Sequence, residues 1–390
     1  MSILQDFVDL REYYGKNCDG VEGPLNSYRI ARSASNPDNF VVWANFGHCH
    51  DFAVGIDRDQ YLAINKALAE AIERAYSMRP PKHQTYAKPS KLHSYLNPTV
   101  FIPLDDTQAE LYGLIPFSHH NRKLHWVEGE MSLGGTVYVP TDMVYYDYPS
   151  KDRLYWGNSS GVAAHLSREL ATKAAIAELI ERDAIMRTWF YQTAPAQVFL
   201  SGYPRLQARQ DYWRDQGRRL FIFHLESTYG NVYLAAIVGS SWPAFVCGAA
   251  ATLDADIESA MEKAVGEAEL NFDSTNLEAK IPADRVCTPE EHGLFYANPD
   301  NLKYVEYLWS SEATDRSDFF VLVDSLDTLR KKLDVSLVWL NGDDEPLKVV
   351  RAFSPRPIPI SFGSLLLHDS HPAVDGERFK APQDVPHFFS

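Results

Sequence analysis

Two glutamates, Glu178 and Glu181, lie one helical turn apart in a stretch whose other side chains are almost all apolar. A helix with so little polar surface is normally buried, and a buried carboxylate is costly unless a cation or a hydrogen-bond donor compensates its charge. Arg182 follows Glu178 by four residues and can pair with it. The pattern therefore indicates either an arginine–carboxylate network inside a core or a divalent-metal site.

The same pattern recurs elsewhere in the sequence, which favours the metal site. The copies are KALAEAIER at 66–74, AAIAELIER at 174–182 and the weaker KAVGEAEL at 263–270. Glu70 and Glu73 mirror the central pair, Arg74 mirrors the central arginine, and Glu267 stands where the first glutamate of each pair stands. Converging carboxylates supply the oxygen ligands that Mg²⁺ prefers, and Mg²⁺ commonly carries nucleotide phosphates. We therefore predict a metal–nucleotide site.

Helices must position these carboxylates, and each glutamate-bearing segment follows a residue that can start one. Side chains of Ser and Asp accept hydrogen bonds from the first free N–H groups of a helix. The candidate caps are Ser167 for the central helix, Asp57 or Asp59 for the first, and Asp254 or Asp256 for the third. A Ser159–Gly161 turn leads into the central helix.

Strand-like segments surround the three helices. Apolar runs separated by turn residues predict a meander over 219–225, 232–238 and 244–249, and further strands at 319–323, 335–340 and 347–352. Helices and strands occur in mixed order, which is typical of an α+β fold with largely antiparallel sheet. The recurring phrase adds an internal duplication to this prediction.

Composition limits the partners and the compartment. The net charge of −15 and the absence of a basic stripe argue against nucleic acid. Cys18, Cys49, Cys247 and Cys287 are far apart, which fits a reducing cytoplasm. The N-terminus lacks the features of a secretory signal, and no run of about 18 apolar residues could span a membrane. We expect a cytoplasmic protein without a membrane partner.

The stretch from Ser159 to Trp189 resembles the signature of the YcaO superfamily, in which a Ser-x-Gly turn leads into a helix ending Glu-Leu-Ile-Glu-Arg-Asp. The first glutamate helix, the Val-Tyr-Val-Pro strand that ends at Pro140, the helix of Glu267 and the segment 349–355 follow in the family's order. The resemblance covers about residues 40–390. It implies a fold with internal repeats that binds ATP and Mg²⁺ between carboxylate-bearing helices.

The resemblance also implies a reaction. Members activate a backbone amide of a ribosomally made precursor peptide by phosphorylating the amide oxygen after a nucleophile has attacked the carbonyl. Cys, Ser or Thr as nucleophile gives a thiazoline or oxazoline, and we expect this cyclodehydration here. Sulfide would give a thioamide, and an amine would give an amidine. An E1-like leader-binding partner, a flavin dehydrogenase and a homodimer are further implications.

Matching positions carry the family's site onto this sequence. Five glutamates would hold Mg²⁺, and one serine and three arginines would address the nucleotide, because the arginine fork suits phosphate. These residues are Glu70, Glu73, Glu178, Glu181 and Glu267, then Ser159, Arg74, Arg182 and Arg351. Where many members have Gly-Lys-Gly, this sequence has Gly47-His48-Cys49, so His48 replaces a phosphate-contacting lysine.

The C-terminus departs from the family as well. Azoline-forming members tend to end in Pro-x-Pro-x-Pro, whereas this chain ends Val-Pro-His-Phe-Phe-Ser. The carboxylate of Ser390 is the candidate general base, since a base must lie within reach of its proton. We expect Phe388 and Phe389 to anchor an arm laid over the surface and to bring that carboxylate toward the ATP cleft.

Two other functions compete with this one. A non-catalytic scaffold that binds peptide would explain the altered tail, although a scaffold has no reason to bury charge. A carboxylate-bridged di-metal oxidase usually has Glu-x-x-His on two helices, and here the histidine positions hold Glu73 and Glu181. For the leading interpretation the predicted parts are an N-terminal extension at 1–45, a catalytic domain at 46–363 and a C-terminal arm at 364–390.

Overall fold

The computed structural model describes most of the chain, in two compact units that are treated separately below. The described residues are 27–45, 52–101, 106–111, 113–116, 122–146, 148, 153–154, 157–275, 278–310, 321–362, 379–382 and 384–390. The first unit comprises Met1–Ile176 and Leu326–Pro355, and the second comprises Ala177–Ser325 and Arg356–Ser390. Helices mix with antiparallel strands in both units, which confirms the predicted α+β fold.

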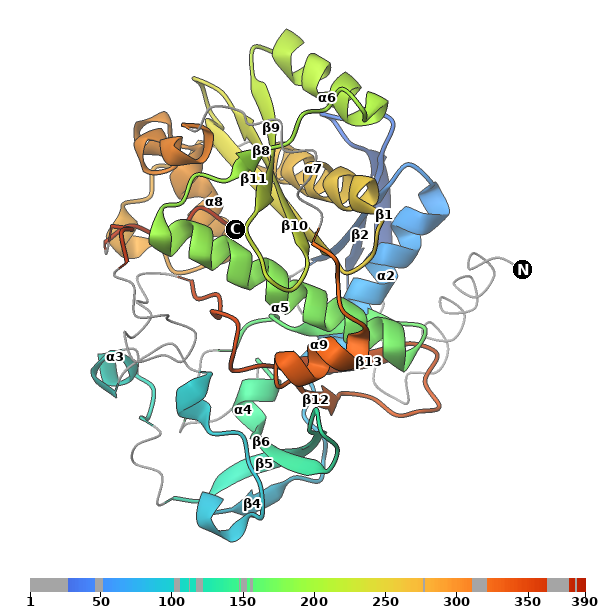
Figure 1. Ribbon diagram of the computed structural model, residues 1–390, viewed down its shortest axis with the longest axis vertical. Coiled ribbons are helices and arrows are strands. Elements are labelled where there is room, and N and C mark those ends of the chain that lie inside the picture. The colour runs from blue at the N-terminus through green and yellow to red at the C-terminus, as the bar shows by residue number, and fades with distance from the viewer. Residues whose placement is uncertain are drawn as a thin grey trace. The chain divides into compact units, whose positions relative to one another are not determined.

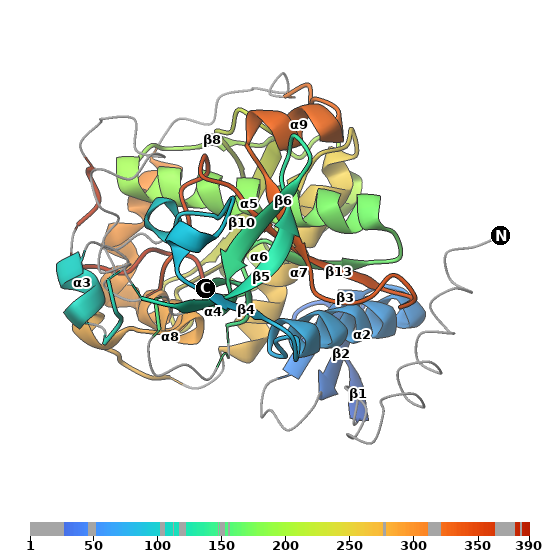
Figure 2. The ribbon, with the colours of Figure 1, turned by 90° about the horizontal axis from the view of Figure 1, so that it is seen from below.

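The first unit begins with a three-stranded antiparallel sheet, β1-β2-β3, that carries helix α2 on one face (Figure 2). Its elements are β1 (Ser27–Arg32), β2 (Phe40–Asn45), β3 (Phe52–Asp57) and α2 (Gln60–Ser77). Asp59 caps α2 by accepting hydrogen bonds from the backbone N–H groups of Tyr61 and Leu62, as predicted. A stripe of buried alanines, Ala63, Ala67 and Ala71, lets the helix approach the sheet closely.

The first unit contains a second sheet, whose last strand along the chain before the central helix leads into that helix. Its order is β4-β5-β12-β13-β7, and β6 pairs with the other side of β5. The elements are β4 (Thr85–Ala87), α3 (Asp106–Leu111), β5 (Leu124–Glu130), β6 (Thr136–Pro140), α4 (Thr141–Val144), β7 (Val162–His165), α9 (Leu326–Lys332), β12 (Ser336–Trp339) and β13 (Lys348–Phe353). Strand β7 leads directly into helix α5 (Arg168–Tyr191). The Ser167 hydroxyl accepts from the Leu170 N–H and so caps α5 as predicted.

The second unit repeats the strand–strand–strand–helix order of residues 27–77. Its sheet has the order β11-β10-β9-β8, and helix α7 packs along β10 and β11 (Figure 1). The elements are β8 (Ala196–Gln197), α6 (Pro204–Asp215), β9 (Arg219–Leu225), β10 (Asn231–Val238), β11 (Phe245–Thr252), α7 (Ile257–Ser274) and α8 (Pro289–Ala297). The predicted meander is therefore confirmed, and Asp256 caps α7 through the Ser259 N–H.

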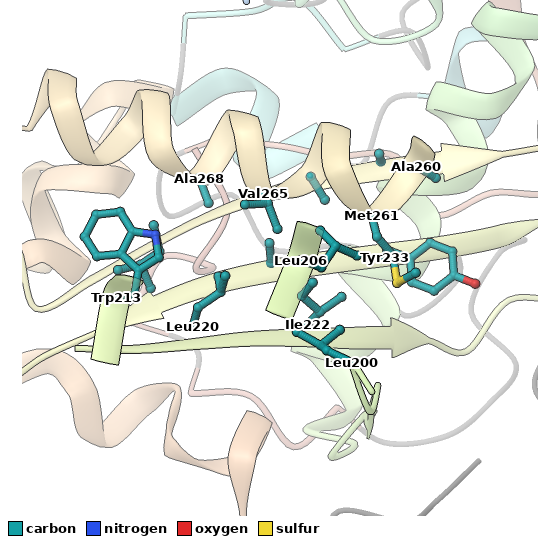
Figure 3. Close-up of a cluster of buried hydrophobic side chains, with 14 of the residues drawn as sticks. Leu200, Leu206, Trp213, Leu220, Ile222, Tyr233, Ala260, Met261, Val265 and Ala268 are labelled. Carbon is teal, nitrogen blue, oxygen red and sulfur yellow. The ribbon is translucent and has the colours of Figure 1, made fainter. Parts of the chain in front are cut away.

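The core of the second unit lies between α7 and the sheet. Figure 3 shows Met261 and Val265 of α7 pointing toward Leu220 and Ile222 of β9, with Trp213 of α6 at one end. All five side chains are buried. This packing fixes the rotation of α7, and it thereby fixes which side chains α7 presents to the edge of β11.

A glycine in each unit shows that the duplication extends to helix–strand packing. A Cβ at Gly55 of β3 would lie 2.0 Å from the Ala63 carbonyl oxygen, and a Cβ at Gly248 of β11 would lie 2.6 Å from the Ala264 carbonyl oxygen. Only glycine permits such an approach between strand and helix. The predicted internal duplication is thus visible as one repeated contact.

This repeated contact also sets a register between the two helices. Ala63 and Ala67 of α2 occupy the places of Ala264 and Ala268 in α7, because each pair touches the glycine of its own unit. Asn271 follows Ala268 by three residues, as Glu70 follows Ala67, so Asn271 occupies in α7 the position that Glu70 occupies in α2. The sequence phrase aligned Glu267 with Glu70, one helical turn earlier.

Two further expectations differ from the structure. The segment 321–323 is irregular, although a strand was expected at 319–323, of which 319 and 320 lie outside the described residues. The side chain of Asn231 replaces a strand partner there, since it donates to the Val321 carbonyl and accepts from the Val321 N–H. The arm was expected on the surface, yet residues 386–389 at its end are buried. Within the described residues, no helix has the length and apolar character needed to cross a membrane.

Candidate functional site

Glu181 and Glu267, two of the predicted ligands, accept hydrogen bonds from the free edge of strand β11 in the second unit. Glu181 Oε2 accepts from the Ala251 N–H at 3.0 Å, and Glu267 Oε2 accepts from the Ala249 N–H at 2.8 Å. Strand β11 ends its sheet, so these N–H groups have no strand partner on that side. The two carboxylates, from α5 and α7, are therefore fixed side by side along one strand edge.

The proximity of the two carboxylates changes their electrostatics. Burial and, after it, the negative charge of Glu181 raise the pKa of Glu267 to about 7. The Ala249 N–H and the cations Lys263 and Arg182 act in the opposite direction. Burial and the neighbouring carboxylate thus disfavour the ionised form of Glu267, and a divalent cation bound between the two carboxylates would stabilise that form.

Arg182 lies beside both glutamates of α5. Its Nη2 pairs with Glu178 Oε1 at 3.2 Å, and its Nε lies 4.0 Å from Glu181 Oε1. The Nε atom is buried and has no hydrogen-bond partner. A buried N–H without an acceptor is costly, so an additional acceptor such as a phosphate oxygen would fit here.

The described residues hold carboxylates that a metal could join, but no metal site that is already formed. Among the residues that the structure describes, no three His, Cys, Asp or Glu side chains come together in an arrangement that could hold a metal ion. Mg²⁺ typically takes one or two carboxylates and completes its shell with phosphate oxygens and water. The Glu181–Glu267 pair fits that requirement, and the metal role of all five glutamates stays a prediction.

The first unit repeats the edge contact of the second. Glu70 Oε2 accepts from the Val54 N–H of edge strand β3 at 2.9 Å, while Glu70 Oε1 pairs with Arg74 Nη2 at 2.6 Å. Glu73 lies on the same helix, half-buried. Each unit therefore uses a glutamate of its helix to hold the free edge of its sheet. Arg74 is paired as Arg182 is, and its phosphate contact remains a prediction.

Two residues of the first unit that were predicted to bind the nucleotide, Ser159 and Arg351, lie at the turn before β7. Arg351 is buried and donates to the carbonyls of Val144 at 2.8 Å and Asn158 at 2.7 Å. It therefore holds the turn that presents the exposed Ser159, with Gly161 following at a positive φ of 74°. Direct phosphate contacts of Arg351 and Ser159 stay predictions. His48 lies outside the described residues.

The C-terminus reaches the same helix as Glu178 and Glu181. Phe388 and Phe389 are each 1% exposed, which confirms that they anchor the chain end. The Phe389 ring lies 5.1 Å from Arg182 Cζ, a cation–π contact. Ser390 follows directly and is half-buried, with its Cβ beside Gly293 of α8. The chain end is thus held next to Arg182, and the role of the Ser390 carboxylate as base stays a prediction.

Sequence reasoning missed the residues that hold the chain end and the match of Asn271 to Glu70. Asn271 Nδ2 donates to the Cys247 carbonyl of β11, as Glu70 accepts from the matching residue of β3. No phrase in the sequence marks Asn271, because its neighbours differ from those of Glu70. His292 and Tyr296, which contact the tail, carry no sequence pattern either.

The family of the chain is shown by a match to a family model. A family model described as YcaO cyclodehydratase, binding ATP and Mg²⁺, matches residues 55–356. No curated protein matches the chain. Similar solved structures include a heterocyclase in complex with substrate and cofactor, with 19% identity and a TM-score of 0.73, covering 90% of this chain and 52% of that one. The present chain thus spans about half of that heterocyclase.

Two full-length matches complete the comparison. YcaO from Methanopyrus kandleri, bound with AMPPCP and Mg²⁺, has 17% identity and a TM-score of 0.68, with 91% of each chain covered. A chain of the E. coli microcin synthetase McbBCD complex has 13% identity and a TM-score of 0.67, covering 96% of this chain and 99% of that one. At these identities the solved structures establish a shared fold.

Proposed function

The chain belongs to the YcaO family, and we propose from this premise that it activates backbone amides of a ribosomally made precursor peptide with ATP and Mg²⁺. The proposed reaction is cyclodehydration of Cys, Ser or Thr to thiazoline or oxazoline. The observation that carries the proposal is the Glu181–Glu267 pair on the edge of β11, beside Arg182 and the chain end. Two neighbouring carboxylates next to an arginine N–H without an acceptor suit Mg²⁺ with phosphate.

The proposed roles of the residues follow from their contacts. In the second unit Glu178, Glu181 and Glu267 would hold Mg²⁺ and Arg182 would balance phosphate charge. In the first unit Glu70 and Glu73 are the proposed Mg²⁺ ligands and Arg74 the proposed phosphate contact. Mg-ATP, when bound, supplies the phosphoryl group that turns the amide oxygen into a leaving group. The carboxylate of Ser390 would accept the proton of the attacking thiol or hydroxyl, for which it needs to lie within about 3 Å or one water of it.

The overall reaction balances in atoms. The side-chain sulfur or oxygen forms a bond to the preceding carbonyl carbon, and the former carbonyl oxygen leaves as phosphate. One ATP becomes ADP and phosphate for each ring, and the peptide loses the elements of one water molecule. No oxidant is needed at this stage. A flavin dehydrogenase, which we propose as a further partner, would oxidise the azoline to an azole.

The proposed setting follows the family. An E1-like partner protein would hold the leader of the precursor, and the chain would act in the cytoplasm as a homodimer. Amidine or thioamide formation is the alternative chemistry at the same site, with an amine or sulfide in place of the side-chain nucleophile. A non-catalytic scaffold is the alternative from another class, and ATP consumption distinguishes it from both.

Nucleotide binding is tested first. Mg-ATP should raise the thermal midpoint of the protein, since a ligand that binds only the folded chain stabilises it. Glu181→Gln and Glu267→Gln should remove the shift, whereas Glu258→Gln in the first turn of α7 should keep it. A wild-type protein without a Mg-dependent shift at millimolar ATP contradicts the proposal.

Peptide modification is tested second. Peptides encoded in short reading frames beside the gene are incubated with the protein, Mg-ATP and the neighbouring partner proteins. Mass spectrometry should show the loss of one water for each ring. ATP binding without any change in peptide mass, for every encoded candidate, would favour the scaffold.

A further inference from the structure

Three successive backbone carbonyls at the end of the chain accept hydrogen bonds from buried side chains of the second unit. Among the described residues no strand pairs with this segment, so side chains take the place of a sheet ladder. The donors are Tyr296 Oη for the carbonyl of Pro386, His292 Nδ1 for that of His387 at 2.8 Å, and Cys247 Sγ for that of Phe388 at 3.5 Å. The backbone is therefore held residue by residue up to the last two positions.

His387 adds a fourth bond, from the tail to the body of the unit. Its Nε2 lies 2.7 Å from the Ser361 carbonyl oxygen, and its side chain is buried. Because carbonyl oxygens only accept, His387 carries its proton on Nε2 and His292 carries its proton on Nδ1. The two rings lie 4.3 Å apart. Both histidines thus act as neutral donors, and burial lowers the pKa of each.

Aromatic packing alone would not define the position of the terminus. Phe388 and Phe389 fill space, but apolar contacts are non-directional and tolerate small shifts of the backbone. Hydrogen bonds to particular carbonyls select one register. Three residues extend at most about 10 Å, so a fixed His387 confines the Ser390 carboxylate to a small region. Ser390 then packs its Cβ beside Gly293 of α8.

We propose that His292 and His387 are positioning residues for the Ser390 carboxylate. They fix the register of the chain end on α8 and on the segment of Ser361, so that Ser390 and its carboxylate are confined to one place beside Gly293 of α8. The catalytic value of this placement rests on the function proposed above, because it requires the carboxylate to act as base. The fixing of the chain end itself does not depend on that function.

Matched variants separate the hydrogen bonds from the volume of the rings. His387→Gln keeps a donor near the place of Nε2, and His292→Asn keeps one near the place of Nδ1. His387→Leu and His292→Leu fill similar space without a donor and leave the carbonyls of Ser361 and His387 unpaired. Ile222→Val, in the core of Figure 3, is the control for a general loss of stability.

The position of the chain end is measured by carboxypeptidase digestion of the full-length protein, followed by intact mass. Each Leu variant should release Ser390 about tenfold faster or more than wild type, the effect of leaving a buried carbonyl unpaired. The Gln and Asn variants and Ile222→Val should remain within about threefold of wild type. Release from both Leu variants at the rate of Ile222→Val would overturn the proposal.

The catalytic consequence is measured as kcat and KM for ATP, with the precursor peptide that the wild-type protein modifies. Both Leu variants should lose kcat about tenfold or more, with KM for ATP within about twofold, and the donor-keeping variants should recover kcat. Equal loss in the Leu variants and in Ile222→Val would overturn the positioning role. If wild type modifies no peptide, the proposed function fails, while the digestion result still decides whether the histidines fix the chain end.

Discussion

The ring of Phe389 packs on the guanidinium of Arg182, with 5.1 Å between the ring centroid and Cζ. Arg182 also pairs with Glu178 through Nη2, so the tail and the carboxylate helix meet at one side chain. The tail has a second attachment to the same helix, because the Lys380 and Ala381 N–H groups both donate to the Phe190 carbonyl. The last residues therefore run along α5 from its end toward its charged middle.

Loss of the chain end should separate turnover from nucleotide binding. Deleting residues 386–390 should abolish peptide modification while the Mg-ATP thermal shift remains, because the proposed ligands of Mg²⁺ lie on α2, α5 and α7 and not in the tail. Extending the chain by a few residues beyond Ser390 should also lower kcat, since it displaces the carboxylate. Asp384→Asn, an exposed change in the same segment, is the control. Full product formation by both tail variants would show that the base lies elsewhere.

Glutamate-to-glutamine changes on the β11 edge should affect ligand binding far more than folding. A glutamine oxygen can still accept the N–H of Ala249 or Ala251, so the strand edge stays satisfied. We expect Glu181→Gln and Glu267→Gln to weaken Mg-ATP by about tenfold or more, about 1.4 kcal/mol, as measured by titration calorimetry. Without Mg-ATP, Glu267→Gln should match or exceed wild type in thermal midpoint, because it removes a like charge beside Glu181. Unchanged affinity in both variants would contradict the assignment.

The repeated glycine contact predicts two matched stability losses. Gly55→Ala and Gly248→Ala place a Cβ against the backbone of α2 or α7, which cannot move without repacking the helix. Each should lower the free energy of unfolding by more than about 3 kcal/mol, as overpacked core positions do at the severe end. Gly202→Ala meets nothing within 4 Å and should change stability little. Thermal denaturation of the three variants compares them, and tolerance of both core changes would refute the repeated contact.

The buried histidines should make the second unit sensitive to acid. Burial lowers the pKa of His292 from 6.5 to about 4, and it also lowers the pKa of His387 well below its usual value. The unfolded chain therefore binds more protons than the folded chain between about pH 6.5 and pH 4. The stability contribution is present above about pH 6.5 and is lost as pH falls toward 4, by roughly 3 kcal/mol for His292 alone.

The charged groups that act on the two rings are Glu291 of α8, for His292, and Arg182 of α5, for His387. Arg182 opposes protonation of His387, and Glu291 favours protonation of His292. His292→Asn should flatten the fall of the thermal midpoint between about pH 6.5 and 4, because the variant has no ring to titrate. An equally steep fall in the variant would assign the acid sensitivity to other groups.

Local features of the sequence predicted much of the fold. Asp59, Ser167 and Asp256 cap the three glutamate helices because capping depends on a few adjacent residues. The meander after the central helix was equally visible, since its apolar runs are separated by turn residues. The resemblance to the YcaO family placed these elements in the order that the family has. The family model confirms the resemblance over residues 55–356.

Contacts between residues that are far apart in the chain could not be predicted from the sequence. The sequence pattern shared by three helices aligned Glu267 with Glu70. The glycine contacts instead match Asn271 to Glu70, because the small residues that touch each glycine determine how the helix is aligned with its strand. The hydrogen bonds from Glu70, Glu181 and Glu267 to strand edges depend on which strand ends a sheet. The hydrogen bonds from His292 and Tyr296 to the tail connect residues about ninety positions apart in the sequence, so no local sequence pattern predicts them.

The most direct test of the account follows the oxygen atom of the activated amide. A precursor peptide is synthesised with a heavy oxygen isotope in the backbone carbonyl that precedes the modified Cys or Ser, and it is incubated with the protein, its partners and Mg-ATP. Amide activation by phosphorylation predicts that the label appears in inorganic phosphate, one labelled phosphate for each ring. Ring formation with unlabelled phosphate, or with the label released as water, would contradict the central claim.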